Sequence, residues 1–417
     1  MRRLVRRLRS WYDYTSFLAS NEWPLLLSVA GVILGAVTIL PSSVGIVLGA
    51  VAFVLGLGAF LRDVHETRRR WADYEFTGIA APFPTAVIKP PPAYPDPIYL
   101  YIPGRGTALV SDPVDRAIAS QPMDARLDEE PYRLPKSLKG SARYVLPKMN
   151  HGRLVFNGKI IGMRGDPLPP GVTPPPPIRL HIARFFDGQC SNEMCTFKIT
   201  HRSGQPGFDP RTELLTNANG QLRTLAESNL ADGIGISTIA VTADNALVVT
   251  RQTARNIASP RLLAPSGSGS LDPRDLGPAS TGRLRREEIL QDLVRHGMER
   301  ELQEETGIRQ DEIRHTKVIG FARWLERGAR PEFFGITELS VTVQDLKEQR
   351  RLTSNERLYT DGTFTLKIDL SGLGRELADG TNLLSAPSLS ETLKDEGSLP
   401  LLLALRAAAL HYASAVR

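Results

Sequence analysis

Three glutamates in the C-terminal half of the chain have the residue type and spacing of a metal-binding site. In the stretch Arg300-Glu-Leu-Gln-Glu-Glu-Thr-Gly307, Glu301, Glu304 and Glu305 stand at positions i, i+3 and i+4, which are neighbours on one face of a helix. Carboxylates this close repel one another, so the group costs stability unless a cation lies between them. Oxygen ligands of this kind suit Mg²⁺ or Mn²⁺, with substrate phosphates completing the coordination shell.

The direction in which these side chains point separates a metal site from an ordinary acidic surface. At about 100° per residue, Glu301 and Glu305 project within about 40° of the centre of an apolar stripe. The stripe consists of Leu290, Val294, Met298 and Leu302. The opposite side of the same helix carries Asp292, His296, Glu299 and Gln303. Inward-pointing carboxylates require a partner or a metal ion. The alternative interpretation is a solvated acidic face, and its glutamates would lie on the side opposite the apolar stripe.

Residues 300–308 resemble the second half of the Nudix box, Arg-Glu-hydrophobic-x-Glu-Glu-x-Gly-hydrophobic, at every fixed position. The resemblance implies a set of metal ligands: Glu301, Glu304 and Glu305. It also implies that Arg300 orients these glutamates through a salt bridge and that Gly307 closes the helix. The implied reaction is hydrolysis, in which metal-activated water attacks a diphosphate attached to another moiety, with Glu304, Glu305 and Arg300 as catalytic residues.

The first half of the box departs from the Nudix pattern at two positions. Asp292 stands where the family has glutamate, and this shorter acid can keep part of that role. Arg286 stands where the family has glycine, and arginine cannot replace glycine where the backbone needs positive φ or close approach. The serine- and glycine-rich loop at 264–270 is either a phosphate-binding turn or a flexible linker. A fourth metal-binding acid is not decided between Glu332, Glu338 and others.

The elements that would position this site form an α/β pattern. We expect a helix over 282–307 and a core helix over 398–416 with Ser398 as its N-cap. We also expect strands, and within Ile239–Thr250 we expect two of them joined as a hairpin that turns at Asp244-Asn245. The expected strands are Arg179–Phe186, Ile239–Thr250, Lys317–Arg323 and Glu332–Val341. Together they predict a cytosolic Nudix-like α/β/α sandwich over residues 178–417.

The apolar segment at 23–61 contains no charged residue. As one helix it would span about 58 Å, roughly twice the ~30 Å hydrocarbon core, whereas a break at Pro41-Ser42-Ser43 leaves two halves that each fit one crossing. Arginines flank both outer ends, so both termini are expected in the cytosol. We therefore predict an N-terminal two-helix transmembrane hairpin, in contact with membrane lipid, in a multi-pass protein of a bacterial-type inner membrane.

Two Gly-x-x-x-Gly pairs lie in this segment, at Gly31 with Gly35 and at Gly45 with Gly49. Such pairs let helices approach closely in lipid. They serve either to pack the two helices of the hairpin together or to form a homo-oligomer through it.

Composition bounds the remaining possibilities. The net charge is +6, but the arginines concentrate beside the apolar segment, where anionic lipid explains them, so nucleic-acid binding is not expected. The two cysteines, Cys190 and Cys195, suit free thiols in a core and a reducing compartment. The predicted organisation is a basic N-terminus (1–22), two transmembrane helices (23–61), a juxtamembrane helix and proline-rich middle region (62–177) and the Nudix-like domain (178–417).

Two functions follow from this sequence. The first is a membrane-anchored, Mg²⁺- or Mn²⁺-dependent hydrolase of a nucleoside diphosphate linked to another moiety, whose substrate is a nucleotide-like small molecule. The alternative is a catalytically weak or inactive Nudix-like nucleotide sensor coupled to the membrane hairpin.

Overall fold

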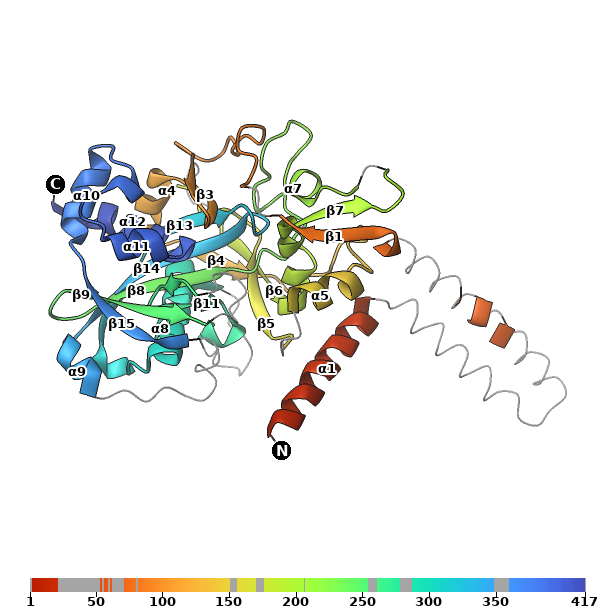
Figure 1. Ribbon diagram of the computed structural model, residues 1–417, viewed down its shortest axis with the longest axis horizontal. Helices are drawn as coiled ribbons and strands as arrows, with labels where there is room; N and C mark the ends of the chain where they lie inside the picture. The colour runs from red at the N-terminus through yellow and green to blue at the C-terminus, as the bar shows by residue number, and fades with distance from the viewer. Residues whose placement is uncertain are drawn as a thin grey trace. The chain divides into compact units, whose positions relative to one another are not determined.

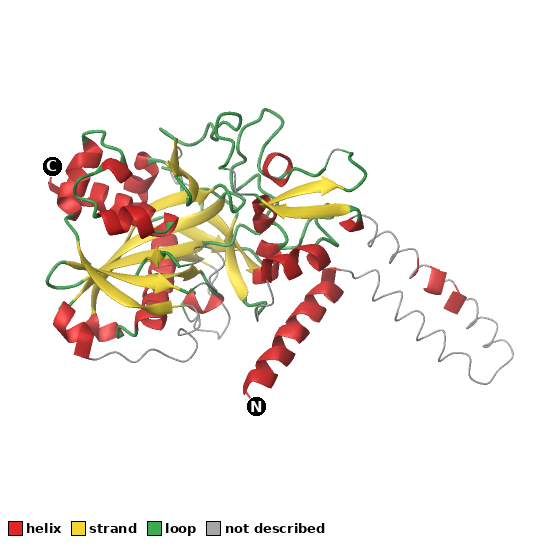
Figure 2. Ribbon diagram, viewed as in Figure 1, coloured by secondary structure: helices red, strands yellow, loops and turns green. Residues whose placement is uncertain are grey.

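The chain forms two compact units, each assembled from segments distant in the sequence. Unit 1 comprises 1–79, 133–158 and 184–213, and unit 2 comprises 80–132, 159–183 and 214–417. The computed structural model (Figures 1 and 2) describes residues 2–21, 53–54, 56–58, 61, 71–79, 82–150, 156–169, 176–205, 207–253, 261–277, 287–348 and 360–416. Stretches on both sides of the predicted boundary at 178 therefore belong to unit 2.

Unit 1 combines helices with a two-stranded antiparallel sheet. In that sheet, β1 pairs with β7, so that Phe76 lies opposite Ile199. Phe17 of α1 packs edge-on against Phe186 of α6, with ring centroids 5.4 Å apart. The elements are α1 (Arg2–Asn21), β1 (Tyr74–Gly78), α5 (Ala142–Asn150), α6 (Phe185–Gln189), η1 (Asn192–Thr196), β7 (Phe197–His201) and α7 (Pro210–Glu213).

The main sheet of unit 2 contains nine strands among the described residues. Its order is β10-β9-β8-β14-β13-β3-β2, with β11 pairing to β8 and β15 pairing to β9. The β8–β14 pair is parallel and the other pairs are antiparallel. The strands are β2 (Ile98–Ile102), β3 (Gly106–Val110), β8 (Gly235–Val241), β9 (Ala246–Gln252), β10 (Leu263–Ala264), β11 (Gly267–Ser270), β13 (Ile313–Trp324), β14 (Arg330–Leu339) and β15 (Thr360–Lys367).

The expected hairpin at Asp244-Asn245 is confirmed as β8 and β9. Asn245 takes a φ of 58°, the left-handed conformation that asparagine tolerates better than most residues. Both strands are rich in β-branched residues and almost wholly buried, as central strands of a sheet covered on two faces should be. The strands expected near 317–323 and 332–341 are likewise confirmed as β13 and β14.

Helices cover both faces of this sheet (Figure 1). Alternate residues of β8 face opposite sides: Ile239 packs with the leucines of α12, whereas Ala240 packs with Leu302 of α8. The predicted core helix with Ser398 at its start is confirmed, since the Leu402 amide donates to the Ser398 carbonyl. The helices of unit 2 are α4 (Asp112–Ser120), α8 (Leu290–Thr306), α9 (Val343–Glu348), α10 (Leu370–Ala378), α11 (Glu391–Glu396) and α12 (Leu399–Val416), with short turns η2 (Pro273–Asp275), η3 (Gln310–Glu312) and η5 (Leu383–Ser385).

A second, four-stranded sheet of unit 2 has the order β12-β4-β6-β5. Its strands are β4 (Asp124–Leu127), β5 (Lys159–Met163), β6 (Ile178–Arg184) and β12 (Glu287–Ile289). The strand expected at 179–186 is confirmed as β6, which ends where α6 begins. The helix expected over 282–307 is only partly correct. Residues 281–286 lie outside the described part, 287–289 pair with β4, and the helix α8 begins at Leu290.

The predicted transmembrane fold class and membrane localisation require correction. Among the residues that the structure describes, no helix is both long enough and apolar enough to cross a bilayer. The long helices α1 and α12 differ from membrane-spanning helices: α1 is rich in arginine, and α12 buries its leucines against the sheet. The fold is a mixed α/β arrangement with several sheets, in place of a transmembrane hairpin joined to a cytosolic sandwich. Most of the segment 23–61 lies outside the described residues.

Two smaller expectations also have an outcome. Cys190 and Cys195 are buried thiols that form no disulfide, as predicted. The juxtamembrane helix expected at the start of 62–177 is described only at its end: residues 62–70 lie outside the described part, Trp71 and Ala72 are helical, and Tyr74 begins the strand β1.

Candidate functional site

The helix α8 carries the three glutamates and packs beside the main sheet. Met298 and Leu302 of this helix are fully buried, and the predicted apolar stripe is confirmed. Gly307 ends the helix with a φ of 73°, and its amide donates to the Gln303 carbonyl. Only glycine adopts this left-handed C-terminal conformation without strain, so the predicted closure at Gly307 is confirmed. Glu299, predicted on the solvent side, is instead buried and accepts hydrogen bonds from Arg295 and Gln310.

Glu301 points inward, and its side chain is 15% exposed. Its Oε1 accepts a hydrogen bond of 2.6 Å from Nη1 of Arg300. A Cβ atom added to Gly269 of β11 would lie 2.1 Å from this Oε1, so only glycine leaves room for the carboxylate there. Burial raises the pKa of Glu301 to about 7, and the positive charge of Arg300 counters part of that rise. The side chain is therefore poised between its neutral and charged forms.

Glu305 lies deeper and has a weaker set of partners. The Ser268 backbone amide donates to its Oε2 at 3.1 Å. Burial raises the pKa of Glu305 well above its ordinary range, and the neighbouring charge of Glu301 adds to that rise. Within the described residues, no lysine or arginine forms an ion pair with Glu305. A buried carboxyl in this position needs a proton or a cation.

Glu304 is placed differently from the other two glutamates. Its side chain is 44% exposed, and its oxygens lie 3.7 Å from Arg300 Nη1 and 3.8 Å from Arg274 Nη1. The structure thus brings Glu301 and Glu305 together in a buried pair and leaves Glu304 at the rim beside two arginines.

Asp275 is a member of this cluster that sequence reasoning missed. Its two oxygens accept from Nε and Nη2 of Arg300, at 2.6 and 2.8 Å. Asp275 also caps its own turn, because its Oδ2 accepts from the Asp272 amide. The motif Asp272-Pro-Arg-Asp275 is a capping box, and that pattern was the signal available in the sequence. Arg300 therefore links η2, Glu301 and the Ser270 carbonyl, to which its Nη2 donates at 3.2 Å.

The strand β11 packs against α8 beside the glutamate pair, and its glycines and serines alternate between the two faces of the strand. Gly269 faces Glu301, whereas Ser270 belongs to the other face, where Arg330 Nη2 donates to its hydroxyl at 2.8 Å. In the register, Ser270 lies opposite Gly235 and Gly235 lies beside Glu332. The loop at 264–270 is thus an ordered strand, and its Ser268 amide is already used by Glu305.

A cleft of about 150 Å³ opens beside β11 and is lined by Ser268, Gly269 and Ser270 of that strand. Arg327, Arg330, Glu332 and Trp324 contribute to its walls. The Arg327 guanidinium lies over the Trp324 ring, 5.1 Å from the ring centroid. Arg330 Nε lies 3.5 Å from Oε1 of Glu332 and donates to the Gly233 carbonyl. The cleft therefore combines two guanidinium groups with one buried acid.

The structure separates the two candidates for a fourth acid. Glu332 is buried at the β11 end of the sheet, in the same strand register as Ser270. Glu338 lies six residues further along β14, roughly 20 Å away at ~3.3 Å per residue, and interacts with Tyr412. Of these two, only Glu332 lies near the candidate site.

The residues present fit a hard divalent cation in part. Glu301 and Glu305 are all-oxygen donors whose raised pKa values a bound cation would reverse. Within the described part of the chain, however, no group of three or more His, Cys, Asp or Glu side chains is placed to hold a metal ion. The buried pair is therefore the core of the candidate site, and Glu304 is not gathered into it.

Of the two residues at which the first half of the box departs from the Nudix pattern, only Asp292 is described, and it lies outside this cluster. Asp292 is half exposed and lies 3.4 Å from Arg295 Nη2. Arg286 belongs to the residues outside the described part.

Comparisons with known proteins add little. No protein-family model matches the chain, and no curated protein matches its sequence. Among solved structures, the chain is similar to the crystal structure of DR0079 from Deinococcus radiodurans, with 15% identity over 36% of this chain and 75% of that one. The TM-score is 0.21, too low to establish a shared fold, so the function must be argued from the site itself.

Proposed function

We propose that this protein is a divalent-metal-dependent hydrolase that cleaves a nucleoside diphosphate linked to another moiety, as the resemblance of residues 300–308 to the Nudix box implies. The observation that carries the proposal is the largely buried carboxylate pair of Glu301, 15% exposed, and Glu305. Two acids taken out of water beside each other destabilise the fold unless a positive charge compensates them. A helix that serves only as structure would place apolar residues at both positions.

The chemistry of the pair favours Mg²⁺ or Mn²⁺ as the missing positive charge. Carboxylate oxygens are the ligands that these small hard cations prefer. When bound, the cation would lower the pKa of a water molecule and stabilise negative charge on phosphate oxygens.

The surrounding residues have roles that follow from their contacts. Arg300 holds the Glu301 carboxylate through its 2.6 Å hydrogen bond, and Asp275 holds Arg300 in turn. Glu305 is fixed by the Ser268 amide. We assign Glu304, at the more exposed rim, to the catalytic metal-ligand role that the resemblance implies for it.

We assign the diphosphate to the cleft beside β11, because its wall includes Gly269, the residue against which the Glu301 carboxylate lies. Arg327 and Arg330 bring positive charge to it, and guanidinium groups suit phosphate oxygens. Its volume of about 150 Å³ is below the ~300–1,000 Å³ of most small-molecule sites. The cleft therefore has room for part of the substrate, which fits a role in holding the charged portion.

A second candidate is a binding protein that takes a similar ligand without turning it over. The observation that favours it is the placement of Glu304, whose oxygens lie 3.7 and 3.8 Å from arginines and apart from the buried pair. This candidate does not include the membrane effector expected from the sequence.

One experiment distinguishes the two. The purified full chain is incubated with nucleotide sugars, dinucleotides and nucleoside triphosphates in Mg²⁺ or Mn²⁺, and phosphate-containing products are measured. We expect turnover that chelation abolishes and that Glu305→Gln lowers by about 10- to 100-fold or more. The matched control is Glu299→Gln, a buried glutamate of the same helix held by Arg295 and Gln310, which should leave turnover unchanged.

The opposite outcomes are equally clear. Saturable binding of one of these nucleotides without product would support the binding protein. Turnover that is unaffected by both chelation and Glu305→Gln would show that the carboxylate pair has no part in the reaction.

A further inference from the structure

A second cavity of unit 2, with a volume of about 490 Å³, lies among α4, β13, α10 and α12. The volume falls within the ~300–1,000 Å³ of typical small-molecule sites. Much of its wall is apolar and comes from α12 and from neighbouring elements: Ile319, Ala378, Ala407, Leu410 and Ala413. These elements lie on the face of the sheet that α12 covers, whereas the glutamate pair belongs to α8 on the other face. The cavity is therefore separate from the site described above.

The acids that line this cavity already have partners. Arg406 Nη2 donates to Asp112 Oδ1 at 2.6 Å, and Arg406 Nη1 lies 3.8 Å from Asp115 Oδ2. The other oxygen of Asp115 accepts from the Phe321 amide at 2.8 Å. Burial raises the pKa of Asp115 to about 7, so this carboxyl carries less than a full charge near neutrality. The acidic edge thus needs no further cation.

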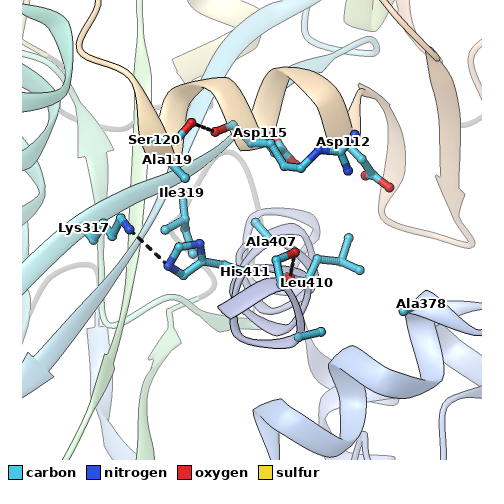
Figure 3. A pocket seen from close by; sticks show the side chains of 13 residues that line it. Asp112, Asp115, Ala119, Ser120, Lys317, Ile319, Ala378, Ala407, Leu410 and His411 are labelled. Carbon is cyan, nitrogen blue, oxygen red and sulfur yellow. Dashed lines mark hydrogen bonds between the residues drawn. The ribbon is translucent and has the colours of Figure 1, made fainter. Parts of the chain in front are cut away.

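The basic edge of the cavity, in contrast, carries positive charge that is not paired with an acid among the described residues. Lys317 on β13 and His411 on α12 point toward one another across the cavity (Figure 3), with Nζ 3.3 Å from Nε2. Since an ammonium can only donate, His411 accepts through Nε2 and is neutral. Burial lowers the pKa of His411, and the Lys317 charge lowers it further. In the described part of the chain, no carboxylate forms an ion pair with Lys317 or with the exposed Arg116 at the rim.

We propose that this cavity binds a small amphipathic monoanion, with its carboxylate against Lys317 and its apolar body along Ile319, Ala407 and Leu410. The Lys317 ammonium supplies a charge-assisted hydrogen bond. The apolar wall gains by being removed from water. A monoanion fits better than a dianion, because Asp112 and Asp115 line the same cavity and repel additional negative charge.

The test uses the full chain and four ligands that share an eight-carbon body: octanoate, octanol, octylamine and octyl phosphate. Binding is measured by isothermal titration calorimetry. We expect saturable binding of octanoate at one site per chain, at least tenfold tighter than that of octanol or octylamine. The substitution Lys317→Gln should lower the octanoate affinity about tenfold or more and leave the octanol affinity unchanged. The control Lys367→Gln, which removes an exposed lysine on β15, should change neither.

A second variant keeps the proposal testable if the loss of Lys317 disturbs folding. Ala413→Phe places a ring in the cavity without removing charge, and it should abolish octanoate binding while the thermal midpoint stays close to that of the unaltered chain. Octanoate affinity equal to that of octanol, or undiminished in Ala413→Phe, would overturn the proposal. Tighter binding of octyl phosphate than of octanoate would overturn the assignment of a monoanion.

Discussion

Asp275 holds Arg300 through two parallel hydrogen bonds, of 2.6 Å from Nε and 2.8 Å from Nη2, at a position where the Asp275 side chain is 2% exposed. The Arg300 side chain is 16% exposed and contacts Glu301 as well. Burial alone would lower the pKa of Arg300, but Asp275 and Glu301 together raise it well above its ordinary range. The arginine is thus permanently charged and fixed in one orientation between the turn η2 and the helix α8.

Removing this acid should destabilise the fold and disturb the site together. Asp275→Asn keeps the shape but loses the negative charge, leaving the guanidinium with Glu301 at 2.6 Å and the more exposed Glu304 at 3.7 Å. Breaking a buried ion pair from one side costs about 3–5 kcal/mol, and we expect a loss of this order in the free energy of unfolding, measured by urea denaturation. Asp272→Asn, which alters the half-buried cap of the same turn, should cost less than about 1 kcal/mol. Equal losses in the two variants would contradict this account.

The glutamate pair predicts that the metal-free protein loses stability as pH rises. Burial raises the pKa of Glu301 from 4.5 to about 7 and raises that of Glu305 well above its ordinary range. Between pH 4.5 and about 7 the native state therefore holds protons that the unfolded chain releases. Stability must therefore fall as pH increases across this window, by on the order of 3 kcal/mol for one such group. Urea denaturation of the unaltered chain and of Glu305→Gln at pH 5 and pH 8, with a chelator present, measures this dependence.

At pH 5 the two proteins should be similarly stable, and at pH 8 the variant should be the more stable. Adding Mg²⁺ at pH 8 should stabilise the unaltered chain more than the variant, since a ligand that binds only the native state shifts unfolding by mass action. A variant that is less stable at pH 8 would show that Glu305 is satisfied as a charged group without a metal ion.

Gly269→Ala should damage the site while sparing the fold. The new Cβ would lie 2.1 Å from the Glu301 carboxylate, which is the far end of a flexible side chain and can move away. We expect a change of less than about 1 kcal/mol in the free energy of unfolding but at least a tenfold loss of the proposed turnover. The control is Gly165→Ala, where the nearest atom is at an ordinary contact distance of 3.7 Å. Full turnover in Gly269→Ala would place the reacting groups away from Glu301.

The turn between β8 and β9 offers a test of backbone conformation alone. Asn245 has a φ of 58°, which β-branched side chains adopt only with strain. Asn245→Val should therefore lower the thermal midpoint by an amount equivalent to about 1–2 kcal/mol, whereas Asn245→Gly should be neutral or slightly stabilising. Differential scanning calorimetry of both variants measures the difference. Two identical midpoints would contradict the left-handed turn.

Sequence periodicity predicted the parts of the fold in which local patterns and final packing agree. The stripe of Leu290, Val294, Met298 and Leu302 is buried as expected, because i, i+4 spacing is a property of the helix itself. The start of α8 was misplaced because Glu287–Ile289 pair with β4, and such a partner, distant in the sequence, leaves no local signal. The same holds for β2 and β3, which complete the sheet from a region to which no fold was assigned.

The candidate site was also predicted only in part. Motif spacing located Glu301 and Glu305, and helix geometry gave their inward direction. It could not find Asp275, which meets Arg300 only after η2 packs beside α8. Nor could it separate Glu304 from the pair, since its direction depends on Arg274 in that same turn. For the apolar segment at 23–61, the lack of charged residues predicts burial but does not distinguish burial in a bilayer from burial in protein.

The alternation of glycine and serine in β11 has a consequence for how the site can be altered by evolution or by design. Gly269 lies against the Glu301 carboxylate and also lines the cleft that holds Arg330, so the two environments share this residue. Any side chain larger than hydrogen at 269 extends toward the acids, and any change at Ser270 alters the contact with Arg330. Substitutions near the acids and substitutions near the guanidinium groups are therefore coupled, because both groups contact adjacent residues of the same strand, β11.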